Sequence, residues 1–137
     1  MADVDWLAVK RLALAIALVL VLAGCGSSGT TLYTKEATSA CLAKPGLDPK
    51  PVAGASDFVA NSATGGAFRV AVAGNQVTVS FGETVGDADN LDDAYRRFRA
   101  KNVGIEDVLR RQGNAIMLWH EHPEDTQLGT VTSCLKG

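Results

Sequence analysis

Hydrophobic and polar residues alternate along two neighbouring stretches, residues 67–72 and 76–81. A period of two is typical of a β-strand with one buried face. Gly74 and Asn75 lie between the stretches and favour a tight turn, so the region predicts a β-hairpin. The cross-strand pairs expected for this turn are Val72 with Val77, Val70 with Val79, and Phe68 with Phe81. One sheet face is then apolar and the other polar, which predicts helices on one side only.

A second hairpin is predicted further along the chain. Residues 108–111 and 115–119 flank Gln112-Gly113-Asn114, so a Gly-Asn turn signal recurs. Residues 116–119 are apolar throughout, which is typical of a central strand.

Two helices are predicted from apolar positions that recur with a period of 3.6 residues. The first covers residues 32–43, with Thr31 as its N-cap and Pro45-Gly46 after its end. The second covers residues 87–101. Its expected buried stripe is Leu91, Ala94, Tyr95 and Phe98.

A third helix is predicted to begin at Pro123. Its inward residues are expected to be Leu128, Val131 and Leu135. Residues 57–60 are expected to form a helical turn or an extended segment, with Phe58 and Val59 either in the core or in an exposed binding patch. The predicted order is α-ββα-ββα. This order indicates an α+β fold, a four-stranded, mainly antiparallel sheet with three helices on one face.

Residues 12–23 form an unbroken apolar run that follows Lys10 and Arg11. The run is shorter than the roughly 20 residues of a membrane span and fits a signal-peptide core of about 7–15 residues. Asp3 and Asp5 are unusual before such a core. Translation from Val9 instead of Met1 is one explanation.

The run closes with Leu22-Ala23-Gly24-Cys25, which resembles the lipobox of bacterial lipoproteins. The resemblance covers residues 1–25 and implies that residues 1–24 are a signal peptide, removed by the lipoprotein signal peptidase. It also implies that Cys25 carries diacylglycerol and anchors the protein to the outside of a cell membrane. The alternatives are an ordinary secretory signal with a chance cysteine, or an uncleaved anchor. Residues 25–30 would be the lipidated cysteine and a flexible tether, and residues 31–137 a single domain.

The lipobox resemblance leaves two of the three cysteines, Cys41 and Cys134, without a role. Two cysteines in an exported domain are most simply a disulfide. The bond would join the first and last predicted helices, which must then be neighbours. Buried free thiols and an intermolecular bond are the alternatives.

The formal net charge of −2 does not change when residues 1–24 are removed, because that segment carries two basic and two acidic residues. Such a balance is not typical of a nucleic-acid-binding protein. The expected partners are the lipid bilayer, through the acyl chains on Cys25, and a further component of the cell envelope.

His120-Glu121-His122 is the one cluster with metal-ligand chemistry. On an extended strand, His120 and His122 point to the same side and could share a metal ion, with Glu124 or Asp125 nearby. The alternative is a polar strand end that leads into Pro123.

Residues 87–92 are acidic, but their spacing fails the EF-hand pattern, and N-capping by Asp87 or Asp89 explains them better. A basic set could bind anionic headgroups or an acidic partner, or be a solvated surface with pairs such as Asp92 with Arg96. This set is Arg96, Arg97, Arg99, Lys101, Arg110 and Arg111.

The chain has neither a GxSxG elbow nor a P-loop, so the sequence predicts neither an enzyme nor a bound cofactor. The expected function is a non-catalytic binding or structural module of the cell envelope. The alternatives are a lipoprotein that binds a metal or small ligand through His120 and His122, and a hydrolase with no recognisable motif.

Overall fold

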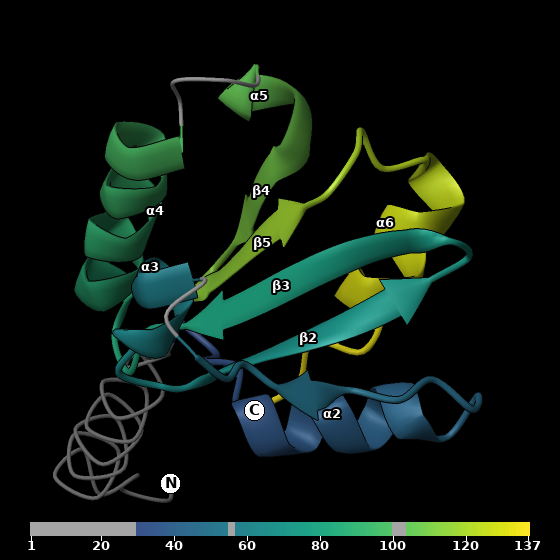
Figure 1. The fold of residues 1–137 in the computed structure, drawn as a ribbon. Helices are drawn as coiled ribbons and strands as arrows, with labels where there is room; N and C mark the ends of the chain where they lie inside the picture. The colour runs from purple at the N-terminus through teal and green to yellow at the C-terminus, as the bar shows by residue number, and fades with distance from the viewer. Residues whose placement is uncertain (1–29, 55–56, 100–103) are drawn as a thin grey trace, which may run out of the picture.

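The computed structural model describes residues 30–54, 57–99 and 104–137 (Figure 1). The predicted signal peptide, the lipobox with Cys25, and Lys101 lie outside these residues. The fold is α+β, as predicted, and its sheet is antiparallel throughout. The strands are β1 (Lys50–Pro51), β2 (Ala67–Val72), β3 (Asn75–Phe81), β4 (Leu109–Gln112) and β5 (Ala115–Trp119), in the spatial order β1-β2-β3-β5-β4. The helices among the described residues are α2 (Lys35–Ala43), α3 (Phe58–Asn61), α4 (Val85–Arg99), α5 (Ile105–Val108) and α6 (Asp125–Thr132).

The prediction of four strands was wrong, because the sheet has five among the described residues. The additional strand β1 is two residues long and pairs with β2 at the edge of the sheet. It contains Pro51, which lacks a backbone N–H donor and is tolerated in an edge strand. A segment so short, in a Pro-rich stretch, carries no alternating pattern, so the sequence predicted a loop there.

The first hairpin forms as predicted, but its register differs by two residues. Val70 pairs with Val77 and Phe68 pairs with Val79, because the turn consists of Ala73 and Gly74. Both turn residues have positive φ angles, 46° and 85°, as a type I′ turn requires. A shift of two leaves every side chain on its predicted face, so the apolar face is preserved.

Both faces of the sheet are covered by helices, so the prediction of three helices on one face was wrong. One core cluster joins Leu42 of α2 and Val131 of α6 to the apolar face of the first hairpin. A second cluster joins Tyr95 of α4 and Val59 of α3 to Ile116 on the opposite face of β5 (Figure 1). Strand β5 is apolar on both faces, and a helix on each side removes both from water.

The predicted helices lie close to their expected positions, with different caps. Thr34 caps α2 instead of Thr31, and its hydroxyl accepts from the backbone N–H of Ala37. At α4 the hydroxyl of Thr84 accepts from the Asp87 N–H, and the Asp87 carboxylate accepts from the Thr84 N–H. This reciprocal pair is a capping box in which Asp87 lies inside the first turn and is not the N-cap.

The predicted buried stripe of α4 is correct for Leu91 and Tyr95 and wrong for Phe98, which is 55% exposed. Phe98 lies on the last turn of α4 and packs edge-on against Phe58, with 4.9 Å between the ring centroids. Val59 is buried, whereas Phe58 is exposed. Residues 57–60 therefore both contribute to the core and expose an aromatic ring.

The predicted disulfide between Cys41 and Cys134 is confirmed, with a Cα–Cα distance of 5.4 Å. It lies against the core cluster that contains α2 and α6. Next to it, the Thr34 N–H donates to the carbonyl of Lys136 at 2.8 Å. The first and last described segments are therefore held together both covalently and by hydrogen bonds.

Buried asparagines hold both hairpin turns against other segments. Asn114 is 1% exposed. Its side-chain amide donates to the carbonyls of Tyr33 and Gly82, and its side-chain oxygen accepts from the Tyr33 N–H. Asn75 likewise forms hydrogen bonds with both backbone groups of Glu121. The two asparagines act as cross-links between segments far apart in the chain.

Replacing both Cys41 and Cys134 with serine should lower the free energy of unfolding by up to about 4–5 kcal/mol, because the disulfide closes a loop of 93 positions. Urea unfolding of oxidised protein measures the loss. The unaltered protein, treated with a reductant, is the matched control and should show a similar loss. An unchanged unfolding midpoint in both samples would contradict this prediction.

Asn114→Ala should lower the free energy of unfolding by about 2–4 kcal/mol, because it removes the partner of two half-buried backbone groups of Tyr33 and of the buried carbonyl of Gly82. Asn90→Ala, at an exposed position of α4, is the control and should change it by less than about 0.5 kcal/mol. Equal effects in a urea titration would show that the cross-link does not stabilise the fold.

Candidate functional site

One part of the sheet surface is not packed against a helix layer. Helices α3 and α4 contact β3 and β5 on their side of the sheet. On the same side of β2 and β3, Ala71 and Gln76 are exposed and Arg69 is half-buried. The register places Lys50 of β1 directly opposite Arg69. The edge half of this face is therefore polar and open to solvent.

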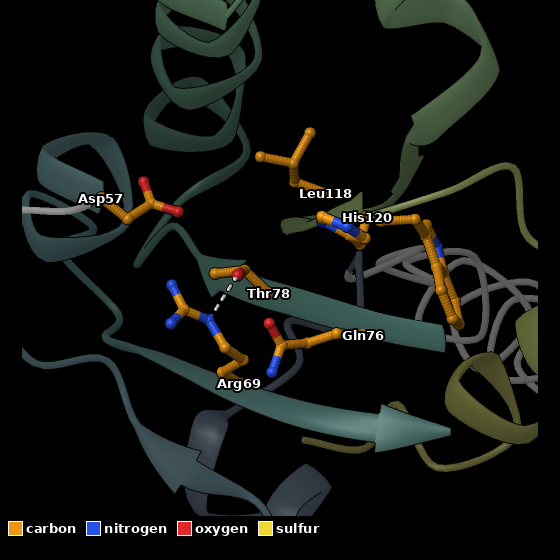
Figure 2. A pocket seen from close by; sticks show the side chains of 7 residues that line it. Asp57, Arg69, Gln76, Thr78, Leu118 and His120 are labelled. Carbon is orange, nitrogen blue, oxygen red and sulfur yellow. Dashed lines mark hydrogen bonds between the residues drawn. The ribbon is translucent and has the colours of Figure 1, made fainter. Parts of the chain in front are cut away.

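Two adjoining cavities lie on this open face. The first, of about 280 Å³, is drawn in Figure 2. It is lined by Asp57, Arg69, Gln76, Thr78, Leu118, Trp119 and His120. The second, of about 470 Å³, is lined by Asp48, Lys50, Pro51, Ala53, Arg69, Val70, Ala71 and Gln76. Because Arg69 and Gln76 line both, we treat the two cavities as one site and call it the sheet groove.

Arg69 lies at the centre of the sheet groove. Its Nε donates to the hydroxyl of Thr78, its cross-strand partner, at 3.4 Å. Among the residues that the structure describes, no carboxylate lies within ion-pair distance of this guanidinium. Its two terminal nitrogens lie on the side of Asp57, away from Gln76 and His120 (Figure 2). Arg69 therefore presents hydrogen-bond donors and a positive charge to the groove.

Acidic residues stand at both ends of the groove. Asp57 lies on the facing wall from Arg69 (Figure 2) and is 2% exposed. One of its carboxylate oxygens accepts from the N–H of Ala60 at 3.1 Å and caps α3. At the other end, Asp48 forms an ion pair of 3.2 Å with Lys50, and both side chains are largely exposed. The positive groups thus lie in the middle of the groove, between two carboxylates.

The histidine pair lies just beyond β5, which ends at Trp119, as the alternative of a polar strand end describes. The cross-link of Asn75 to Glu121 holds the chain as it leaves the sheet. The backbone N–H of His120 donates to the carbonyl of Gln76 at 2.8 Å, and the side chain of His120 lines the groove. Residue His122 is exposed and is not part of the groove.

No group of three or more His, Cys, Asp or Glu residues in the described part of the chain is arranged to hold a metal ion. The first cavity, lined by His120, contains only one further residue of these types, Asp57. Metal binding by His120 and His122 stays a prediction from the sequence.

Several residues of the basic set form ion pairs on the surface. Arg96 bonds to Asp92, as predicted, and also to Glu106, while Arg111 bonds to Asp89. The pKa of Arg96 is raised, mainly by its hydrogen bond to Asp92. These pairs favour the interpretation of a solvated surface over that of a ligand site.

Sequence reasoning missed the residues at the centre of the groove. Arg69 and Thr78 alternate with the apolar residues of the first hairpin, so the pattern placed them on a polar face without giving them a role. Lys50 lies in a strand that the sequence did not predict. The one signal available was a lone arginine among alanine, valine and phenylalanine in residues 67–72.

No protein-family model, curated protein or solved structure matches this chain. Within residues 30–54, 57–99 and 104–137, none of the helices has the length and apolar character needed to cross a membrane. The chemistry of the groove must therefore be argued from its own residues. The hydroxyl of Thr78 accepts from the Arg69 guanidinium, a cation and not a general base, so this pair suits ligand binding better than nucleophilic catalysis.

Proposed function

We propose that the protein is a lipid-anchored, extracytoplasmic, non-catalytic binding domain that takes its ligand in the sheet groove. The observation that carries the ligand site is the half-buried guanidinium of Arg69, which lines both cavities and has no carboxylate partner among the described residues. A concave polar surface with a few convergent donors is typical of a binding site.

The proposed location rests on two features that support each other. Leu22-Ala23-Gly24-Cys25 resembles a lipobox, and the Cys41–Cys134 disulfide is typical of proteins in oxidising compartments outside the cytoplasm. The five residues from Gly26 to Thr30 reach at most about 18 Å when extended. A lipid on Cys25 would therefore keep the domain close to the membrane surface.

The proposed non-catalytic role rests on the composition of the groove. Its polar groups are one arginine, one lysine, two carboxylates, an amide, a hydroxyl and one imidazole. The buried carboxylate of Asp57 caps a helix, and Thr78 is bonded to Arg69. These groups offer hydrogen bonds and charge to a ligand, or to a further component of the cell envelope.

In its native cells the mature protein should begin at Cys25, carry diacylglycerol, and lie in the membrane fraction. Cys25→Ala should abolish lipidation and leave the precursor uncleaved, because the thiol is the group that receives the lipid. Ser27→Ala, two residues further along, is the matched control and should be processed normally. Intact-protein mass spectrometry distinguishes these products, and an unlipidated product that begins elsewhere would refute the anchor.

A photoreactive amino acid placed at Ala71, in the groove, should cross-link to a ligand or envelope component when native cells are illuminated. The same amino acid at Ala43, an exposed alanine at the end of α2, is the control and should give no such product. Mass spectrometry of the cross-linked species is the measurement. Identical products from both positions, or none from Ala71, would argue against the sheet groove as the binding site.

A further inference from the structure

We propose that the sheet groove recognises an oxyanion, the carboxylate or phosphate group of a small molecule, and holds it between Lys50 and Arg69. This inference rests on the proposed function, because it names the ligand chemistry of the same groove.

The first argument is the register of the edge strands. Lys50 and Arg69 are directly opposite each other in the β1–β2 ladder and both line the larger cavity. Like charges at directly opposed positions destabilise a sheet. An anion placed between them removes this repulsion and gains the attraction of both. Asp48 offsets part of this repulsion through its exposed ion pair with Lys50, and the two cations together still make a suitable site for a negative ligand.

The second argument is the hydrogen-bonding state of Arg69. Its Nε is bonded to Thr78, which orients the guanidinium, while its terminal nitrogens have no carboxylate partner among the described residues. A guanidinium presents paired N–H groups whose geometry matches the two oxygens of a carboxylate or phosphate. Because Arg69 is half-buried, salt screens its charge less than that of a fully exposed arginine.

The neighbouring groups limit what else the ligand can carry. Lys50 is paired with Asp48, but exposed ion pairs are weak, so an incoming oxyanion can share this lysine. Gln76 lines both cavities and can donate through its amide. The carboxylate of Asp57 on the facing wall already caps α3. We therefore place the oxyanion between Lys50 and Arg69 and not at that wall.

The size of the groove suits a small molecule. Its two cavities, about 280 and 470 Å³, are within or close to the range of small-ligand pockets.

The test is a titration of the full chain in neutral detergent micelles. The probes are inorganic phosphate, citrate and glycerol 3-phosphate, and the binding of each is measured by isothermal titration calorimetry. Saturable binding of citrate alone assigns a carboxylate, and saturable binding of inorganic phosphate assigns a free phosphate. Binding of glycerol 3-phosphate without inorganic phosphate assigns a phospholipid headgroup.

The variants Arg69→Gln and Lys50→Gln should each lower the affinity for the probe that binds by at least about tenfold. Arg97→Gln, which removes the same charge from an exposed position on α4, is the matched control and should leave the affinity within about twofold. Arg69→Lys keeps the charge but loses the paired donors, so its affinity should fall between those of Arg69→Gln and the unaltered chain.

A stability measurement keeps the inference testable if a variant folds poorly. The bound probe should raise the melting temperature of the unaltered chain more than that of Lys50→Gln.

No saturable binding of any probe at 10 mM, or equal weakening by Arg97→Gln, would overturn the oxyanion inference. If the photoreactive residue at Ala71 still captures a ligand in that case, the sheet groove remains a binding site for other chemistry. If Ala71 captures nothing either, the proposed function fails as well.

Discussion

The arrangement of the whole domain depends on the burial of β5 on both of its faces. Met117 and Trp119 point into the cluster beneath α2 and α6, and Ile116 points into the cluster beneath α4. A strand that is apolar on both sides must be covered on both sides, because each exposed apolar face costs free energy in proportion to its area. This requirement places α4 across the sheet from the other two long helices.

The open groove follows from the same requirement. Helix α4 and the short α3 cover the part of the face near β3 and β5. The edge half, on β1 and β2, carries Lys50, Arg69 and Ala71 instead of large apolar side chains. With little apolar surface to bury there, a helix would gain little by packing on it. The polar half of the face is therefore left available to a ligand.

Buried amide side chains fix the segments around the groove. Gln127 donates to the carbonyls of Val72 and Ala73 in the first turn, and its oxygen accepts from the Glu124 N–H. Together with Asn75, it ties the first hairpin to the loop that carries His120. These hydrogen bonds are made away from water, where an unpaired backbone group is costly. The wall formed by Gln76 and His120 is consequently held by groups outside the groove.

The sequence by itself determined the local elements and the covalent frame of the domain. The apolar pattern located both hairpins and the three longer helices, α2, α4 and α6. It could do so because the period of two residues in a strand and of 3.6 residues in a helix is a property of each element alone. The cysteine count in an exported-type chain predicted the Cys41–Cys134 disulfide. These elements and the disulfide could be predicted from such short-range rules, whereas their arrangement in space could not.

Only the tertiary structure decided which groups meet across the chain. It placed the first turn at Ala73-Gly74 and Asn75 in the following strand, where Asn75 forms partly buried hydrogen bonds with Glu121, 46 residues away. It also placed α4 on the second face and brought Lys50 opposite Arg69 through a strand of two residues. These outcomes depend on contacts between distant segments, which no local pattern encodes. The candidate site is made of such contacts, so the sequence predicted a binding domain but not where it binds.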